Sequence, residues 1–449
     1  MLESQQKCIV IFALVCCFAV LVALIFSAVD VWGEDEDGIT EENCNKNCRV
    51  VLVENIPEDV TFSENGTAHL TLSAGLHSLL DLAVAGRSVE IVSPQWNLNS
   101  SDYESSFLPS SSQGRALLQR LRGLKKKGIN LKIASEVHYI NMTALTKGFL
   151  HSSFWVVDRK HIYIGSATMD WRSLSMGQKR AGEDGGSQGW RGERHWAVEG
   201  RQEQGRRMKE LGIIIYNCSC LALDLHRSSP DVFCPKDRTR DLDAISYVIQ
   251  KAKRFIYISI TDYLPLTNRN SHRYWSGIDG MLREALILRN IKVRLLVSCW
   301  EQTHPLTFNF VWSLKTLCME LPNCSLEAKF FSPREQRDGT LQGINHNRFI
   351  VTDSAVYIGN FDWVGNEFTF NAGAGMVISQ AEGVKERNST LVEQVRDAFE
   401  RDWYSRHTKS LQANKIPVCN KHQLNQLAHL KITQPTESSG SQESPNGSM

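Results

Sequence analysis

The chain has 449 residues, and its 50 lysines and arginines nearly balance its 49 aspartates and glutamates. A net charge of +1 does not favour steering toward nucleic acid, and a hydrophobic content of 42% excludes a fibrous or broadly disordered chain. The length suffices for two domains of ordinary size or for one large duplicated domain with a substantial core.

The first predicted element is a membrane-spanning helix at residues 8–29, a run of 22 residues without a charged side chain that is long enough to cross a bilayer. The alternative is a cleaved signal peptide, but the run exceeds a usual signal core and no small-residue cleavage site follows it. Lys7 precedes the run and an acidic stretch follows it, which favours a cytoplasmic N-terminus at residues 1–7. We therefore expect a single-pass type II signal-anchor protein. Its body would be luminal or extracellular, in the endoplasmic reticulum, on the endolysosomal route or at the cell surface.

Asparagines in the Asn-x-Ser/Thr pattern fit a chain that meets the glycosylation machinery. The pattern occurs at Asn65, Asn99, Asn141, Asn217, Asn323, Asn388 and Asn446. Each triplet alone is weak evidence because such triplets also arise by chance. Together they predict a glycoprotein.

The cysteines indicate an oxidising compartment. Near the start of the body, Cys44 and Cys48, with Cys218 and Cys220 after a predicted buried strand, would form two adjacent disulfides that tie the N-terminal arm to the core. Four further cysteines would supply two more bridges and leave Cys234 over; they are Cys299, Cys318, Cys324 and Cys419. A zinc site is the alternative, but no histidine stands at ligand spacing, so we expect no metal and no cofactor.

The body shows one order of helices and strands twice, after a luminal linker and arm at residues 30–67. In the first half, at residues 68–225, helices are predicted at 68–87 and 113–127 and strands at 88–92, 130–134 and 211–216. In the second half, at residues 226–432, helices are predicted at 242–254 and 277–288 and strands at 255–260 and 291–297. The matching order predicts an internal duplication rather than two unrelated halves.

Two segments fall outside this order. Residues 176–208 lack a sustained apolar period and interrupt the first half, so they are either a long flexible insert or a splice or gene-model artefact. The tail at residues 433–449 has the composition of a disordered segment.

Each half contains a histidine-bearing hairpin. His151 precedes an apolar strand, Asp158 follows it, and the next strand ends at Gly165 and Ser166. In the second half His346, Asp353 and a strand ending at Gly359 repeat the pattern. Two such hairpins predict one composite site, although two core histidines with satisfied hydrogen bonds are the alternative.

These residues resemble the phospholipase D superfamily, whose signature is His-x-Lys-x4-Asp followed by Gly-Ser-x-Asn, present twice. The resemblance covers nearly all of the chain beyond the predicted span. It is strongest for the single-pass luminal branch that includes endolysosomal nucleases, which the stretches 170–174 and 216–220 support. It implies an α/β fold of two duplicated halves, with mixed sheets packed around one composite site.

The family mechanism gives each residue type a role. One histidine attacks the phosphorus and forms a phosphohistidine, the other acts as acid and base, and the lysines and asparagines hold the phosphate oxygens without a metal. His151, His346, Asp158 and Asp353 match the catalytic positions. Glu210 matches the acid that orients one histidine, and its second-half counterpart is missing near Phe370 and Asn371.

The positions that should hold phosphate have changed. Gly165, Ser166 and Arg348 remain as substrate-binding remnants, whereas the degraded positions are Ser153, Thr168, Asn360 and Asp362. The resemblance therefore implies a membrane-anchored pseudoenzyme that acts by binding an unknown protein or ligand, with a homodimer as one form. The alternative is a residual phosphodiesterase, either a phospholipase or a single-strand exonuclease, that acts through a phosphohistidine.

Overall fold

The computed structural model describes residues 48–57, 60–62, 70–84, 86–99, 111–134, 142–175, 207–218, 239–267, 273–332, 343–379, 389–412, 416–417 and 419. The predicted span at residues 8–29, most of the arm, residues 176–206 of the predicted insert and the C-terminal tail lie outside these ranges. Within them, no helix combines the length and the apolar character that a membrane crossing needs.

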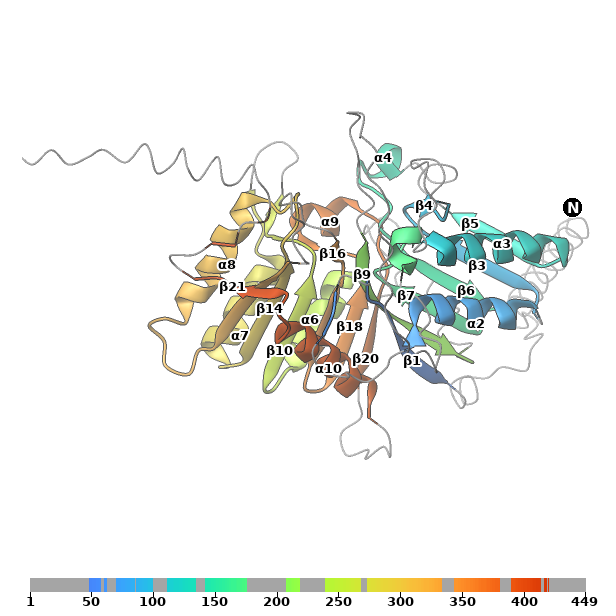
Figure 1. The fold of residues 1–449 in the computed structure, drawn as a ribbon. Helices are drawn as coiled ribbons and strands as arrows, with labels where there is room; N and C mark the ends of the chain where they lie inside the picture. Colours follow the sequence, from blue (N-terminus) through green and yellow to red (C-terminus); the bar gives the residue numbers. More distant parts are fainter. Residues whose placement is uncertain are drawn as a thin grey trace, which may run out of the picture. The chain divides into compact units, whose positions relative to one another are not determined.

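The first half contains a mixed sheet whose main strands run in the order β2-β1-β9-β7-β6-β3-β5. The strands of the first half are β1 (Arg49–Asn55), β2 (Leu70–Thr71), β3 (Ser88–Val92), β4 (Trp96–Asn97), β5 (Asn130–Ala134), β6 (Phe154–Val157), β7 (His161–Gly165), β8 (Met169–Asp170) and β9 (Met208–Tyr216). Of these, β4 and β8 pair in a separate two-stranded sheet. The helices of the first half are α2 (Leu72–Val84), α3 (Ser112–Lys126), α4 (Met142–Leu145) and the 3-10 helix η3 (Trp171–Leu174). Helices α2 and α3 pack side by side against this sheet (Figure 1).

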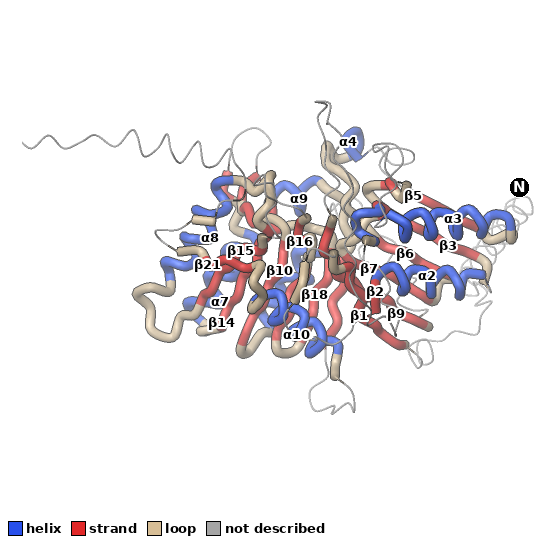
Figure 2. The backbone as a smooth tube through the Cα atoms, in the orientation of Figure 1, coloured by secondary structure: helices blue, strands red, loops and turns tan. Residues whose placement is uncertain are grey.

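The second half contains a sheet in the order β20-β18-β17-β10-β14-β15-β21. Figure 2 labels β18, β10, β14, β15 and β21 of this sheet. The strands of the second half are β10 (Phe255–Ile260), β11 (Tyr263–Leu264), β12 (Leu266–Thr267), β13 (Arg273–Tyr274), β14 (Lys292–Ser298), β15 (Leu326–Phe331), β16 (Ile344–Asn345), β17 (Phe349–Thr352), β18 (Ala355–Gly359), β19 (Trp363–Val364), β20 (Gly375–Ser379) and β21 (Thr408–Ser410). Of these, β11 pairs with β19 and β12 with β13 in separate two-stranded sheets, and β16 pairs with β9 of the first sheet. The helices of the second half are α6 (Asp241–Lys251), α7 (Gly277–Leu288), α8 (Pro305–Leu317), α9 (Gly365–Phe370) and α10 (Leu391–Trp403).

The two sheets repeat one topology, which confirms the predicted duplicated fold. The order β9-β7-β6-β3-β5 matches β20-β18-β17-β10-β14, and the strand directions match as well. In each half one parallel pair, β3 with β5 or β10 with β14, is followed by antiparallel pairs. Both histidines therefore enter corresponding hairpins, β6–β7 and β17–β18.

A shared hydrophobic cluster joins the halves. It combines side chains of the first sheet, such as Phe154 and Ile213, with Tyr257 and Phe349 of the second sheet. Helix α10 also packs into this cluster and places the fully buried Trp403 there. Burial of this much apolar surface fixes the hairpins of the two halves against each other.

A buried ionic network joins strands β1 and β9 of the first half to helix α10. Lys209 Nζ on β9 lies 2.7 Å from Asp402 Oδ2 on α10. Arg401 donates through Nη1 and Nη2 to Glu54 on β1, at 2.9 and 2.8 Å. The network fixes the beginning of β9, which is the strand that carries Glu210.

Three disulfides are present among the described residues. Cys48 pairs with Cys218, which confirms that the N-terminal arm is tied to the core. The other two bridges join Cys299 to Cys419 and Cys318 to Cys324. Cys44, Cys220 and Cys234 lie outside the described residues.

The predicted glycosylation sites stay predictions. Asn217 and Asn323 are exposed and have positive φ angles of 58° and 65°, and Asn99 is half-buried. The remaining four asparagines lie outside the described residues; they are Asn65, Asn141, Asn388 and Asn446.

Candidate functional site

Each histidine is held in place by the opposite half of the chain. The backbone N–H of His151 donates to Ala372 O at 2.7 Å, and that of His346 donates to Lys209 O at 2.8 Å. The short strand β16, just before His346, pairs with β9 of the first sheet. This reciprocal anchoring brings the two histidines together into one site, as the repeated hairpins predict.

Glu210 lies beside the imidazole of His346. The carboxylate is fully buried on β9, and His346 Nδ1 lies 3.1 Å from each of its oxygens. Ser166 Oγ donates to Oε2 at 2.5 Å, and Ser173 Oγ donates to Oε1 at 2.8 Å. Because a carboxylate only accepts, His346 donates through its Nδ1–H.

The guanidinium of Arg348 lies between His346 and Asp362. Arg348 Nη2 is 2.8 Å from His346 Nε2, and a guanidinium cannot accept, so Nε2 is the acceptor in this contact. Arg348 Nε and Nη2 also donate to Asp362 Oδ2, at 2.9 and 2.8 Å. The lone pair that a nucleophilic histidine would use is therefore committed to Arg348.

His151 is the more exposed of the two histidines, with 29% of its side chain open to solvent. Its Nδ1 lies 3.7 Å from Glu367 Oε2, which is longer than a hydrogen bond. Burial and the positive charge of Arg348 lower the pKa of His151 to about 4. Burial and the charge of Asp362 hold the pKa of Glu367 well above its usual value. At neutral pH the His151 imidazole is therefore uncharged, so the two side chains do not form an ion pair.

Three carboxyl groups gather around Arg348. Asp362 Oδ1 accepts the backbone N–H groups of Thr261 and Asp262 at 2.8 and 3.0 Å, and Asp362 N–H donates to Glu367 Oε2 at 2.8 Å. Burial acts to raise the pKa of Asp362, but the charge of Arg348 outweighs it and lowers that pKa. Burial and the charge of Asp362 raise the pKa of Asp262 to about 7. The lowered pKa keeps Asp362 ionised at neutral pH.

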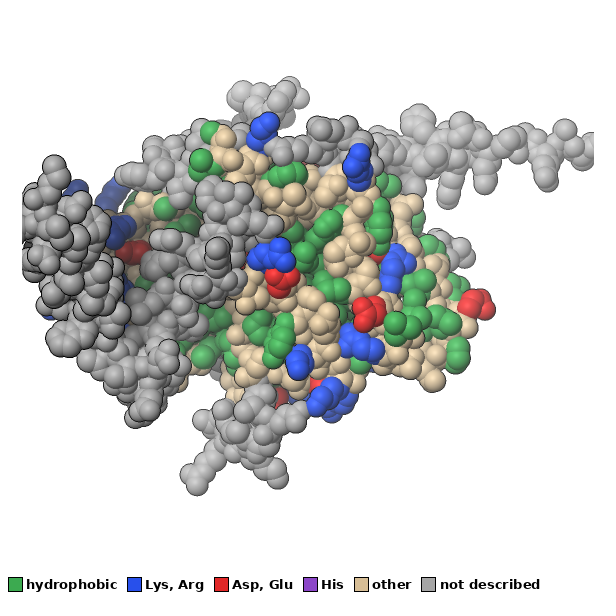
Figure 3. All heavy atoms as spheres, turned by 180° about the vertical axis from the view of Figure 1, so that it is seen from behind, with side chains coloured by type: hydrophobic (Ala, Val, Ile, Leu, Met, Phe, Trp, Pro, Cys, Tyr) green, Lys and Arg blue, Asp and Glu red, His purple; other side chains and the backbone are tan. Residues whose placement is uncertain are grey.

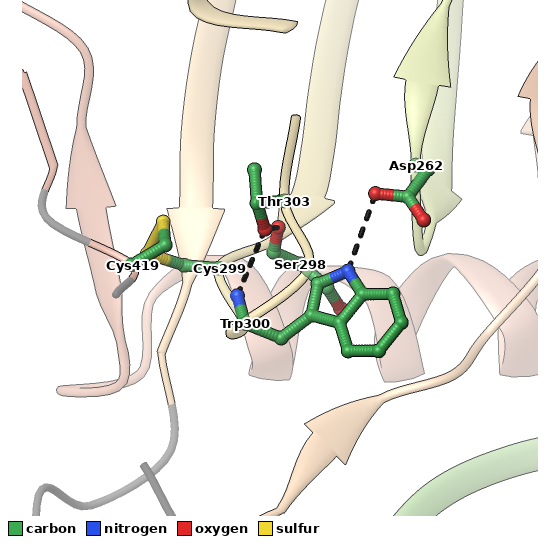
Figure 4. Close-up of a disulfide and its surroundings, with 6 residues drawn as sticks. All are labelled: Asp262, Ser298, Cys299, Trp300, Thr303 and Cys419. Carbon is green, nitrogen blue, oxygen red and sulfur yellow. Dashed lines mark hydrogen bonds between the residues drawn. A yellow bond between two sulfur atoms is a disulfide. The ribbon is translucent and has the colours of Figure 1, made fainter. Parts of the chain in front are cut away.

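A disulfide holds the loop that supplies a donor to Asp262. Trp300 Nε1 donates to Asp262 Oδ1 at 3.2 Å, and Trp300 directly follows Cys299, which is bridged to Cys419 (Figure 4). Thr303 Oγ1 accepts the backbone N–H of Trp300 at 2.9 Å. The Cys299–Cys419 disulfide and the hydrogen bond from Trp300 N–H to Thr303 thus fix the loop that positions the indole.

The register of the two sheets identifies the second-half position that corresponds to Glu210. Gly212 on β9 pairs with the last residue of β7, and Gly375 on β20 pairs with the last residue of β18. Glu210 precedes Gly212 by two residues, and Gly373 precedes Gly375 by two. The sequence predicts a missing acid near Phe370 and Asn371, and the register places the gap at Gly373.

An aromatic ring occupies the space beside Gly373. A Cβ atom at this position would lie 2.4 Å from the ring of Phe361. The centroids of the Phe361 and His151 rings are 6.3 Å apart. His151 therefore faces an apolar ring, whereas its partner histidine contacts a buried carboxylate.

Two of the degraded positions, Ser153 and Asn360, form hydrogen bonds within the protein. Ser153 Oγ donates to Ala167 O, and Ser153 N–H donates to Asn360 Oδ1 at 3.2 Å. Asn360 Nδ2 donates to Gly165 O at 2.8 Å, which joins the two hairpins. Thr168 is buried, with 6% of its surface exposed. Ser153 and Asn360 thus hold the turns together.

The two aspartates of the repeated motif lie outside this group. Each follows the first strand of its hairpin, at the end away from the histidine. Asp158 Oδ1 accepts the backbone N–H groups of Arg87 and Ser88 at 2.6 and 2.7 Å, and Asp353 Oδ1 accepts those of the two residues before β10, both at 3.0 Å. Both carboxylates therefore fix hairpin turns, and the assignment of Asp158 and Asp353 to the catalytic remnant stays a prediction.

Two members of the site were not predicted from the sequence. Asp262 follows β10 at the carboxyl end of a parallel pair, the edge at which such sheets often place functional groups, so a signal for it existed. Glu367 lies on α9 and has no motif spacing that links it to His151.

Comparison with known proteins supports the family assignment. The family described as PLD3/4, PLD-like domain matches residues 63–182 and 227–336. The chain is 45% identical to inactive phospholipase D5 of Mus musculus, over 93% of this chain and 84% of that protein. The corresponding human protein is 43% identical, over 99% and 88%. The human 5'-3' exonuclease PLD4 is 33% identical, over 81% and 79%. The predicted resemblance to the phospholipase D superfamily is confirmed.

Proposed function

This chain belongs to the phospholipase D family, with the PLD3/4, PLD-like domain, and we propose that it is a pseudoenzyme of that family that acts by binding. The observation that carries the proposal is the contact of Arg348 with both His346 Nε2 and Asp362 Oδ2. A nucleophilic histidine needs a free lone pair, and a phosphate needs free cationic donors. The contact with Arg348 occupies the lone pair of His346, and the contact with Asp362 occupies the cationic donors of Arg348.

The expected loss of transition-state stabilisation is large enough to favour catalytic inactivity. One charge-assisted hydrogen bond contributes about 1.5 to 3 kcal/mol, and about 1.4 kcal/mol of transition-state stabilisation corresponds to a factor of ten in rate. Ser153 stands where the family motif has a lysine, and its hydroxyl is bonded to Ala167 O. Since several such positions have changed at once, the loss spans orders of magnitude even when the individual effects are not additive. The names of the two relatives that are 45% and 43% identical to this chain support the same conclusion.

The proposal is tested by assaying the purified full-length protein on 5'-labelled single-stranded DNA and on phosphatidylcholine. An active 5'-3' exonuclease of the family serves as the positive control, and His346→Ala is the matched variant. We expect the wild-type and variant rates to equal the blank on both substrates. Turnover that His346→Ala abolishes would refute the proposal.

A residual phosphodiesterase is the second candidate, and the contact between His346 and Glu210 favours it. This pair keeps one histidine oriented by a buried carboxylate, as acid–base catalysis requires. The exonucleases at 31 to 33% identity make single-stranded nucleic acid the first substrate class to assay, and phospholipid the second. On the face shown in Figure 3, however, basic side chains are scattered among acidic and apolar ones. That distribution does not favour a nucleic-acid groove on this face.

We further propose that residues 8–29 anchor the protein as a single-pass type II membrane protein. The body would be luminal or extracellular, glycosylated, and bound to a protein or ligand partner or to a second copy of the chain. Three disulfides support an oxidising compartment. Protease protection of the body in sealed microsomes, with digestion only of the first residues, tests this topology.

A further inference from the structure

Four hydrogen-bond donors converge on one carboxylate in the composite site. Arg348 Nε and Nη2 donate to Asp362 Oδ2, and the backbone N–H groups of Thr261 and Asp262 donate to Oδ1. The Asp362 side chain is 5% exposed and that of Arg348 is 10% exposed, so solvent competes weakly for these donors. The arrangement is an anion-binding site whose anion is part of the chain.

Such a donor set is not specific for a carboxylate. The guanidinium fork binds carboxylate and phosphate oxygens with similar geometry, and paired backbone N–H groups are common in phosphate sites. We propose that Asp362 acts as a built-in anion that occupies an oxyanion site, and that this site takes phosphate or sulfate once the carboxylate is neutralised. The inference rests on the proposed function, since it explains why a phosphate group does not enter the wild-type site.

The intramolecular carboxylate has an advantage over any external anion. It is always present at the donors, whereas a phosphate must displace it and would then face its charge. When Asp362 is replaced by asparagine, the amide oxygen can still accept the two backbone N–H groups, but Arg348 loses its counter-charge. An uncompensated buried cation is costly, so the variant gains affinity for an anion.

The neighbouring titratable groups determine the pH of the test. Glu367 and Asp262 face Asp362, and both have raised pKa values because of burial and the charge of Asp362. His151, with a pKa of about 4, is neutral. At pH 6 Asp262 retains more of its proton than at pH 8, so repulsion of a bound phosphate is smaller there.

The test compares thermal unfolding midpoints of the full-length wild type, Asp362→Asn and Asp353→Asn at pH 6. Each is measured with sodium phosphate, with sodium sulfate and with sodium chloride at the same ionic strength. Asp353→Asn is the matched control, because Asp353 also accepts backbone N–H groups in the second half but lies outside the site. We expect phosphate and sulfate to raise the midpoint of Asp362→Asn by at least about 2 °C. The other two proteins should shift by less than half of that.

Equal shifts in all three proteins, or none in Asp362→Asn, would overturn the inference. If Asp362→Asn does not fold in chloride, Asp362→Ser replaces it under the same criterion. The double variant Arg348→Gln/Asp362→Asn removes the cation and should lose the phosphate response. Further arms with thymidine 5'-monophosphate and glycerol 3-phosphate separate a nucleotide end from a lipid headgroup as the source of phosphate. Wild-type hydrolysis would refute the proposed function, whereas an absent phosphate shift with inactive wild type refutes only this inference.

Discussion

Glu210 and His346 come from opposite halves of the chain, and the carboxylate of the first lies 3.1 Å from Nδ1 of the second. The pair is a structural bridge as well as a remnant of acid–base chemistry. Because Glu210 is fully buried, its removal leaves polar groups without an acceptor in a space that excludes water.

We therefore expect Glu210→Ala to lower the free energy of unfolding by about 2 to 4 kcal/mol. The substitution takes away the acceptor of Ser173 Oγ and of His346 Nδ1–H. Glu210→Gln keeps one acceptor oxygen and should cost less than half as much. Urea unfolding of the full chain with intact disulfides measures both. Equal stability of the wild type and Glu210→Ala would contradict the bridging role.

The dependence of the free energy of unfolding on pH should reveal the titration of Asp262, a member of the carboxyl cluster around Arg348. Burial and Asp362 raise the pKa of Asp262 from 3.8 to about 7, so between these values the folded protein holds a proton that the unfolded chain has released. Stability then falls as pH rises through this window, by at most about 1.4 kcal/mol per pH unit for this group. Asp262→Asn should flatten the profile between pH 4.5 and 7 and run parallel to the wild type above pH 7.

Asp241 supplies the control for that measurement. Burial raises its pKa to about 6, although Tyr357 donates a hydrogen bond to it, and it lies on α6. Asp241→Asn should flatten only the part of the profile below about pH 6. Parallel profiles of the wild type and Asp262→Asn throughout pH 4.5 to 7 would show that Asp262 does not titrate there.

The disulfides should differ in their contribution to stability. Cys299 and Cys419 are 120 residues apart, and Cys318 and Cys324 are 6 apart. In the chain-entropy model these bridges contribute about 5 and about 2 kcal/mol. Replacing Cys299 and Cys419 by serine should therefore lower the unfolding midpoint in urea more than replacing the close pair. The reverse order would show that loop closure does not dominate.

Much of the fold follows from local pattern. The strands β3, β5 and β10 and the helix α7 begin and end at the predicted residues, because apolar period and turn residues define them. The first helix is shorter than its predicted range of 68–87. It begins at Leu72 because the two preceding residues pair with β1 as β2, a tertiary contact that the helical period does not reveal.

The predicted insert also ends earlier than its composition indicates. The predicted insert extends to Met208, but Met208 is the first residue of β9 and pairs with Ile344 of β16. The polar residues around Lys209 hide the strand, and they are buried there because the ionic network with α10 compensates their charges.

The sequence predicts only those site residues that belong to the duplicated motif. The duplicated motif locates both histidines, and the contacts of Arg348 with Asp362 follow from residues that the motif marks as altered. The position of Glu367 beside His151 depends on how α9 packs against β12 and β19, and no sequence spacing encodes it. The exchange of a carboxylate for an aromatic ring at Gly373 becomes visible only through the sheet register.

The most direct test of the account is whether either histidine becomes phosphorylated. The full-length protein and an active exonuclease of the family are incubated with single-stranded DNA or phosphatidylcholine, quenched at alkaline pH and analysed by mass spectrometry. Because Arg348 holds His346 Nε2 and Asp362 fills the oxyanion position, we predict that His151 and His346 remain unmodified while the active relative is trapped. A phosphohistidine at either position in the wild-type chain would contradict the account.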